Sequence, residues 1–356
     1  MFRKILLFLA ITAMLLAACA GPAAPAAPAA PTASPAPSTA TAEPTTAVVA
    51  TEIPAPTETL APTGTTVPTA IPGPTATPAP LTFTDGLSNT ITLAGPAQKR
   101  VSLAASNTEI LFAIGAGAQV VGRDMFSDYP AEAKAVADIG GSWGDLNVEA
   151  ILTLEPDLIL ASGLQTPEQV QSLQEAGLTV YYLSNPVDLE GLYTNLESVA
   201  NLTGRLSEAS ALIEALKARV AAVVEKVSGA TNLPTVYYEL DATDPAAPYT
   251  AGPGTFVNTL IEMAGGVNIA GTLDSPWVQL SSEKIIELNP ALIILGDSAY
   301  GVTAESVAAR AGWEALDAVK NGQIFPFDDN LVSRPSPRLV DGLEALAKIL
   351  HPDLFK

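Results

Sequence analysis

The sequence is short of the residues on which most enzyme active sites depend. Its 356 residues include one cysteine, Cys19, and one histidine, His351. One histidine leaves a Ser-His-Asp triad or a histidine-ligated zinc site almost nothing to work with, and one cysteine cannot form an internal disulfide. No glycine-rich loop of phosphate-binding spacing follows an expected strand. These shortages argue against an enzyme, with neither a catalytic cofactor nor a metal expected, although a glycosidase-like pair of carboxylates stays open.

Basic residues are also scarce. The chain has 17 Lys and Arg against 37 Asp and Glu, which gives a net charge of −20 at pH 7. Nucleic acids and anionic membrane surfaces attract positive patches, so this balance argues against both as direct partners. We interpret the excess of acid as the solvated surface of an exported protein.

Residues 1–80 do not have the composition of a globular domain. A positive start leads into Ile5–Leu16, an apolar run of about a dozen residues that is too short for a transmembrane helix. Leu16-Ala-Ala-Cys19 then resembles a bacterial lipobox, which predicts residues 1–19 as a signal peptide and Cys19 as the acylated first residue; a plain secretory signal is the alternative. Residues 20–80 are almost entirely Ala, Pro and Thr, so we expect a disordered tether.

One stretch of the remaining chain occurs twice. The segment that begins at Trp143 recurs at Trp277, 134 positions later, and Glu149 falls on Glu283 at the same offset. The chain has only three tryptophans, so two at a common offset argue against chance. The repeat therefore indicates two lobes of similar build.

Each copy has the same local order of features. A Trp stands in a loop, a capping residue follows (Asn147; Ser281 or Ser282), and Glu lies in the first helical turn, where the helix dipole favours a carboxylate. A proline then ends the helix, and an apolar run at 158–161 or 292–295 is typical of a buried parallel strand. Singly, each Glu fits a helix cap and each Trp fits core packing; their recurrence in two lobes favours paired use.

The alternation of apolar runs and helical patterns predicts an α/β fold. Residues 81–188 read as an N-terminal lobe and 229–356 as a C-terminal lobe, each a mainly parallel sheet flanked by helices. Between them, residues 189–228 have helical periodicity throughout and read as a long interlobe helix, with a break at Gly204. In the first lobe, Ser106-Asn-Thr-Glu109 is expected to cap a helix.

Aromatic residues collect in the expected loops. These residues are Phe126, Trp143, Tyr249 and Trp277, and polar residues from Asp328 to Arg338 add to another loop after a strand. Ligands of open parallel sheets sit at loops beyond the carboxyl ends of strands. Each aromatic alone could equally be packing; four of them, divided between two lobes, predict an aromatic-walled cleft.

Several motifs together resemble the solute-binding proteins of ABC importers for cobalamin, ferric siderophores and haem. The motifs are Val101–Ile110, Ser127-Asp-Tyr-Pro130, Asn147-Val-Glu149 with its Pro-Asp-Leu-Ile continuation, the long middle helix, and Arg334-Pro-Ser-Pro-Arg338. The resemblance implies two lobes joined by a rigid helix, a ligand between them, little hinge closure, and an ABC permease and ATPase as partners. We expect a monomer that is lipid-anchored outside the cytoplasm.

Within this family the chain is most similar to the cobalamin-binding branch. That branch lines its corrinoid site with side chains that match Phe126, Trp143, Tyr249 and Trp277 here. Arg334 matches the branch well and Asp329 less well, because the spacing is one residue longer. The resemblance also implies that Glu149 and Glu283 are the lobe-tip carboxylates that pair with arginines of the permease.

The chemistry of the ligand agrees with a corrinoid. A corrinoid is large, flat-faced and rimmed by amides, which suits aromatic walls and a few hydrogen-bonding groups. A ferric siderophore or haem is the alternative: Arg334 and Arg338 could serve an anionic ligand, but no histidine is placed to serve iron. A surface receptor or adhesin without a transport partner is the alternative of another class.

Overall fold

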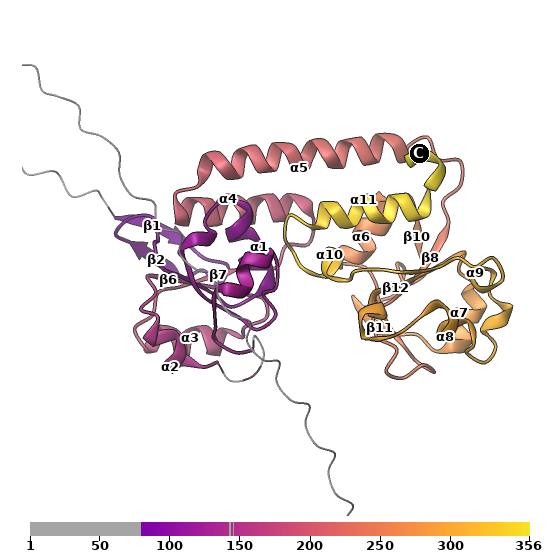
Figure 1. Cartoon of the computed structure of the whole chain (residues 1–356), viewed down its shortest axis with the longest axis horizontal. Helices are drawn as coiled ribbons and strands as arrows, with labels where there is room; N and C mark the ends of the chain where they lie inside the picture. The colour runs from indigo at the N-terminus through magenta and orange to yellow at the C-terminus, as the bar shows by residue number, and fades with distance from the viewer. Residues whose placement is uncertain (1–79, 142–143, 145) are drawn as a thin grey trace, which may run out of the picture. The chain divides into compact units, whose positions relative to one another are not determined.

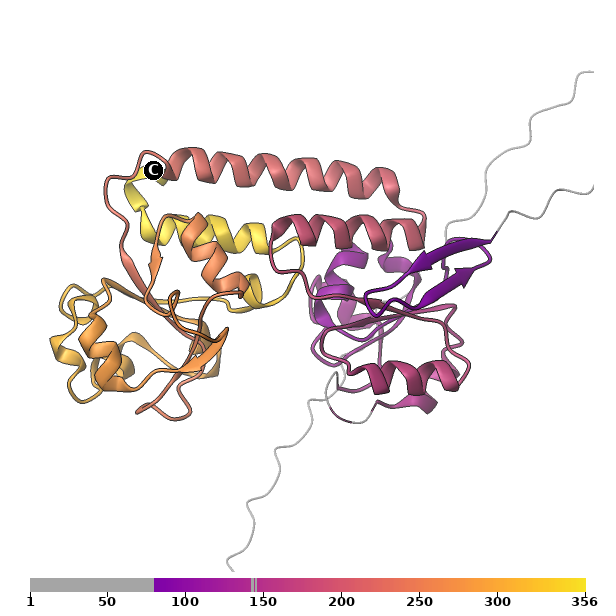
Figure 2. The ribbon, with the colours of Figure 1, turned by 180° about the vertical axis from the view of Figure 1, so that it is seen from behind.

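The computed structural model describes residues 80–141, 144 and 146–356. The signal peptide, Cys19, almost all of the tether and Trp143 lie outside the described residues. The described chain contains two parallel sheets flanked by helices, which confirms the predicted α/β class (Figures 1 and 2).

The N-terminal lobe is built on a five-stranded parallel sheet of order β5-β4-β3-β6-β7. Its strands are β3 (Arg100–Ser102), β4 (Val120–Arg123), β5 (Ala137–Asp138), β6 (Leu158–Ser162) and β7 (Val180–Leu183). The helices are α1 (Ala105–Ala113), α2 (Val148–Thr153) and α3 (Pro167–Glu175). An antiparallel hairpin, β1 (Leu81–Thr84) with β2 (Thr90–Leu93), precedes the sheet.

The C-terminal lobe is built on a four-stranded parallel sheet of order β10-β8-β12-β13. Its strands are β8 (Thr235–Glu239), β10 (Val267–Asn268), β12 (Leu292–Leu295) and β13 (Ile324–Pro326). A second, two-stranded antiparallel sheet pairs β9 (Tyr249–Ala251) with β11 (Trp277–Gln279). The helices are α6 (Phe256–Met263), α7 (Ser282–Leu288), α8 (Ala304–Ala308), α9 (Asp317–Lys320), α10 (Asn330–Ser333) and α11 (Leu339–Leu350).

Two helices, and not one, connect the lobes. α4 (Leu189–Thr203) ends at Gly204, whose φ of 71° lies in the left-handed region that suits glycine at the end of a helix. α5 (Leu206–Val227) then runs alongside α4 at one end and α11 at the other (Figure 1). The break falls at the glycine where the sequence predicts it, and α5 packs on both α4 and α11 of the C-terminal lobe.

The repeated strands bury alternate residues in different cores. In β6, Leu158 and Leu160 join a large cluster while Ile159 joins a cluster confined to the N-terminal lobe. In β12, Leu292 and Ile294 join the same large cluster, and their neighbours join a cluster confined to the C-terminal lobe. Each sheet is therefore covered on both faces, which explains why both strands are apolar without interruption.

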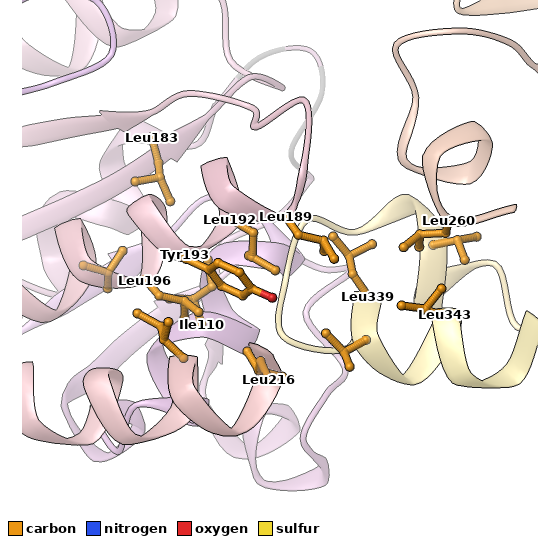
Figure 3. Packing of buried hydrophobic residues seen from close by; sticks show 14 of the residues in the cluster. Ile110, Leu183, Leu189, Leu192, Tyr193, Leu196, Leu216, Leu260, Leu339 and Leu343 are labelled. Atoms are coloured by element: carbon orange, nitrogen blue, oxygen red, sulfur yellow. The ribbon is translucent and has the colours of Figure 1, made fainter. Parts of the chain in front are cut away.

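The large cluster is continuous from one lobe to the other. It takes side chains from α1, α4 and α5 and from α6 and α11, among them Leu189, Leu260 and Leu339 (Figure 3). The two lobes thus share one hydrophobic core.

Candidate functional site

Two adjoining cavities occupy the region where the sequence predicts a cleft. The first, here called the interlobe cavity, has a volume of about 300 Å³ and is lined by loops of the N-terminal lobe, including Phe126, and by the α10 region with Arg334. The second, here called the acidic cavity, has a volume of about 690 Å³ and is lined by C-terminal-lobe residues, including Tyr249. Tyr300 and Asp329 line both, so the cavities meet along these two side chains.

Phe126 is held at the cavity by the turn that follows β4. Its backbone N–H donates to a carboxylate oxygen of Asp124 at 3.2 Å, and the Ser127 hydroxyl donates to the other oxygen. Asp124 is buried, so this turn is fixed from inside the lobe. The Phe126 ring is 41% exposed, a large apolar surface at the position where a ligand wall is predicted.

Tyr249 and Trp277 lie in short strands and not in loops, so that part of the prediction is wrong. In the β9–β11 pair, Trp277 lies opposite Ala251 and Gln279 lies opposite Tyr249. Both rings stay largely open, at 43% exposed for Tyr249 and 50% for Trp277. Tyr249 lines the acidic cavity, whereas Trp277 is not among the described residues that line either cavity. The antiparallel pairing fixes the backbone beneath both rings.

Arg334 lines the interlobe cavity, but its guanidinium is already engaged. One terminal nitrogen donates to Glu109 at 3.1 Å and to Asp128 at 2.7 Å. Asp329 lines both cavities and accepts the Tyr238 hydroxyl at 2.6 Å. Burial raises the pKa of Asp329, although the Tyr238 hydroxyl acts in the opposite direction. Both residues therefore line a cavity, and each is oriented by protein partners; their contact with a ligand stays a prediction.

A buried carboxylate that sequence reasoning missed links the two lobes. Glu109, in α1, is 3% exposed and accepts the Ser336 hydroxyl at 2.5 Å. Two nitrogens of Arg338 also donate to Glu109, at 2.6 and 2.9 Å, in addition to Arg334. We call these four residues the Glu109 cluster. The expectation that Ser106–Glu109 caps a helix is wrong, because α1 begins at Ala105 and its first turn has no side-chain cap.

The Glu109 cluster is extended by an aromatic ring. The guanidinium of Arg338 lies 4.2 Å from the centre of the Tyr129 ring, within the range of a cation–π contact. Burial by itself would lower the pKa of Arg338, but the hydrogen bonds to Glu109, together with the negative charges of Glu109 and Asp328, outweigh burial and raise this pKa. Several charge-assisted hydrogen bonds hold the Glu109 carboxylate in one position. Because Arg334 donates to this carboxylate, the cluster fixes the position of the Arg334 guanidinium at the interlobe cavity.

Glu149 and Glu283 occupy equivalent, exposed positions in the two lobes. Asn147 caps α2 by accepting from the Ala150 N–H at 3.0 Å, and Ser281 caps α7 by accepting from the Lys284 N–H at 3.2 Å. Each Glu follows its cap by two residues and is exposed. The backbone N–H of Glu283 and the Ser281 hydroxyl lower the pKa of Glu283, so this carboxylate is ionised at neutral pH. The local order of cap, Glu, helix and strand is thus the same in both copies.

The described residues hold neither a metal cluster nor a membrane span. Within residues 80–141, 144 and 146–356, no group of three or more His, Cys, Asp or Glu is arranged to bind a metal ion. None of the helices in that part of the chain combines the length and the apolar character needed to cross a bilayer.

Comparison with known proteins finds relatives that are all named as binding proteins. A family model described as "Periplasmic binding protein" matches residues 101–331. The uncharacterized ABC transporter substrate-binding lipoprotein YvrC of Bacillus subtilis (strain 168) is 32% identical, over 78% of this chain and 87% of that protein. The cobalamin-binding protein of Halobacterium salinarum (strain ATCC 29341 / DSM 671 / R1) is 31% identical, over 76% of this chain and 74% of that protein.

A solved structure extends the comparison to the fold. The periplasmic heme-binding protein RhuT from Roseiflexus sp. RS-1, in its apo form, is 28% identical and superposes with a TM-score of 0.65, covering 72% of this chain and 99% of that one. These relatives are binding proteins by name, and the names cover more than one class of ligand.

Proposed function

The chain belongs to the periplasmic binding protein family, and from this premise we propose that it captures a corrinoid in its cleft and delivers it to an ABC importer. The membership confirms the resemblance seen in the sequence. The protein is an ABC-type substrate-binding protein of the family whose members serve vitamin B12, siderophores and haem. The ligand, the membrane anchor and the docking residues are the parts that we propose.

The distribution of open aromatic rings along the cleft carries the corrinoid proposal. Phe126 stands on the N-terminal lobe, and Tyr249 and Tyr300 line the acidic cavity on the C-terminal lobe. Flat rings on opposite sides suit a flat macrocycle, because aromatic faces gain most from stacking on a second extended face. Trp277 lines neither cavity, but it is half exposed in the strand that pairs with the strand of Tyr249, and we propose that it contacts the ligand beyond the cavity wall. We propose the same role for Trp143 of the N-terminal lobe.

The polar groups of the cleft also suit a neutral ligand with a polar rim. Arg334 is paired with Glu109 and Asp128, so little free positive charge faces the interlobe cavity from this side chain. Haem carries two propionates and would gain from unpaired cations. Asp329 accepts hydrogen bonds and is placed to meet donors. A relative named for cobalamin at 31% identity supports the same choice.

We further propose that Cys19 carries a lipid anchor and that residues 20–80 hold the binding domain away from the membrane. The lipobox-like Leu16-Ala-Ala-Cys19 supports the first part, as does the word "lipoprotein" in the name of the Bacillus subtilis relative. Two acyl chains bind a bilayer firmly where one binds only marginally. The protein would then act as a monomer at the outer face of the membrane, with the permease and ATPase as partners.

Titration of the purified chain with a panel of ligands tests the ligand assignment. Cobalamin, cobinamide, haem and a ferric siderophore are added in turn, and tryptophan fluorescence reports binding. We expect saturable quenching with the two corrinoids at concentrations where haem and the siderophore give little. Tighter binding of haem or of the siderophore would overturn the corrinoid proposal and favour the alternative ligands of the same family.

A further inference from the structure

The wall of the acidic cavity has an unusual composition for a ligand site. Three acidic residues, Asp241, Asp297 and Asp329, line it together with the aromatic residues Tyr249 and Tyr300. No Lys or Arg is among the described residues that line it. Tyr300 is 89% exposed, which leaves its ring free to cover a bound molecule. Such a wall attracts positive charge and hydrogen-bond donors and repels anions.

One oxygen of Asp297 has no partner. Asp297 is 3% exposed and lies in the turn Gly296–Tyr300 that follows β12. Its Oδ2 accepts the Ala242 N–H at 3.1 Å, but no hydrogen bond reaches its buried Oδ1 from the part of the chain that the structure describes. Buried carboxylate oxygens are rarely left without a donor, because the loss of hydration is then not offset. This oxygen therefore points to a missing donor.

Nearby groups cannot supply that donor. The guanidinium of Arg310, whose charge acts on Asp297, is held by two bonds to Glu239, which is fully buried. The Tyr238 hydroxyl, also buried, donates to Asp329. Burial, with the negative charge of Glu239 as the second cause, raises the pKa of Asp297 to about 6. At neutral pH the group is mostly ionised and lacks a full set of donors.

We infer that the acidic cavity is a subsite for hydrogen-bond donors of the ligand, in which Asp297 selects carboxamide or ammonium groups over carboxylates. This inference rests on the proposed function and adds to it the residue that sets the ligand class. A corrinoid presents its rim as carboxamides, whose N–H groups donate to a carboxylate. A haem presents propionates, which a wall of three carboxylates repels. Asp297, Asp241 and Tyr300 thus join the ligand-binding residues that the sequence predicts.

A pair of corrinoids that differ in one group tests the inference. The full chain is titrated with cobinamide and with a cobinamide in which one propionamide is hydrolysed to propionate, each monohydrolysed isomer being used separately. Wild type should prefer the amide over at least one isomer by about tenfold or more, the scale of one charge-assisted hydrogen bond. Asp297→Asn, whose own NH₂ can donate to a carboxylate, should reduce that preference to roughly threefold or less.

Asp328→Asn is the matched control. Asp328 adjoins Asp329 in sequence and carries the same charge, but it is exposed and is not among the described residues that line the acidic cavity. The control should keep the wild-type preference, and melting temperatures of all three proteins exclude misfolding as the cause of any change. The inference is overturned if every isomer binds wild type as tightly as cobinamide, or if the two Asn variants change the preference equally.

Failure of the inference can be distinguished from failure of the corrinoid proposal. If wild type binds no corrinoid, the same variants are titrated with a ferric trihydroxamate that carries a free primary ammonium and with its N-acetylated form. If wild type prefers the ammonium form and Asp297→Asn loses this preference, the donor subsite is supported and only the identity of the ligand changes. Equal binding of both forms, or binding of neither, would remove the subsite as well.

Discussion

The two copies of the helix–strand unit have similar backbones and different surroundings. α2 leads to β6 in one lobe and α7 leads to β12 in the other, each with a side-chain cap and an exposed Glu. The buried acidic residues of the two lobes differ in where their hydrogen-bond partners come from. Glu109 of the N-terminal lobe is bound by Arg334, Ser336 and Arg338, which follow α10 of the C-terminal lobe.

In the C-terminal lobe, the buried acidic residues Glu239 and Asp297 bond to partners in the same lobe. Glu239 is held by Arg310 of the same lobe, and Asp297 has one oxygen without a partner. The repeat thus determines the layers and the exposed glutamates, whereas residues outside the repeat determine how the lobes join and what the cleft binds. Four predictions test this division.

The largest effect is expected where the two copies are most alike. If the exposed glutamates of both lobes dock a permease, Glu149→Arg with Glu283→Arg should abolish uptake and pull-down of the permease, since like charges would then face each other. Ligand affinity should be unchanged, because neither residue is among those lining the two cavities. High salt should weaken the wild-type complex.

Glu155→Arg with Glu287→Arg is the control for the docking experiment. It makes the same change of charge near the other ends of the two helices, where both side chains are largely exposed. Uptake should persist in this control. Normal uptake by the Glu149 and Glu283 double variant would reduce these residues to helix-terminal charges and leave the repeat as architecture alone.

The second prediction compares the two buried glutamates. Glu109→Ala and Glu239→Ala each remove the buried carboxylate to which a largely buried guanidinium, Arg338 or Arg310, donates two hydrogen bonds, so each should lower the free energy of unfolding by about 3–5 kcal/mol in urea titrations. Only Glu109→Ala should also change the small-angle X-ray scattering profile of the folded protein, because only Glu109 bonds across the lobes. Equal scattering changes in both variants would contradict this distinction.

The third prediction concerns Asp297, whose removal should stabilise the protein. Its pKa is raised from 3.8 to about 6, chiefly by burial. Between these pH values the unfolded chain loses the proton while the native protein retains it, so stability falls as pH rises, and the penalty stays in place above the folded pKa. Asp297→Asn avoids it and should be more stable than wild type at pH 8, by up to about 3 kcal/mol.

Urea unfolding at two pH values checks this sign. Near pH 3.5 both states of wild type hold much of the proton, so the advantage of Asp297→Asn over wild type should largely disappear. An advantage that is equally large at both pH values would show that ionisation of Asp297 is not the cause.

The smallest effect compares two tryptophans. Trp277 is half exposed, so Trp277→Ala should weaken ligand binding by about 1–3 kcal/mol and leave the melting temperature of the free protein nearly unchanged. Trp313 is fully buried in the C-terminal-lobe cluster, and Trp313→Ala should instead destabilise the fold. A large drop in melting temperature for Trp277→Ala, without an effect on affinity, would assign Trp277 to packing.

Local patterns predicted the elements well. β12 coincides with the apolar run at 292–295, β6 extends the run at 158–161 by one residue, and α4 ends at Gly204, where a break is expected. The offset of the repeat also placed the two caps, Asn147 and Ser281, at matching positions. These features depend on residues close together in the chain, which is the information that periodicity carries.

Pairings between distant segments were missed. Glu109 and Arg334 are 225 positions apart, and the residues around either one do not indicate the other as its partner. Trp277 lies in a strand because that segment pairs with β9, which the residues around Trp277 do not indicate, and the sequence therefore predicts a loop there. Asp297 and Tyr300 belong to a short turn without a recognisable motif, and their importance arises only from the cavity that surrounds them. Site residues that are brought together by the fold are thus harder to predict from the sequence than residues whose position follows from local spacing.

The hydrophobic cluster that extends from α1 and α4 through α5 to α6 and α11 has a consequence for cooperativity. A domain with two separate cores can melt in two stages, but a core that both lobes share links the loss of one to the loss of the other. Calorimetry of the free protein should therefore give one transition, with equal van't Hoff and calorimetric enthalpies. Either lobe produced alone would expose the apolar surface that Leu189 and Leu339 bury in the whole chain, so we expect neither lobe to fold independently.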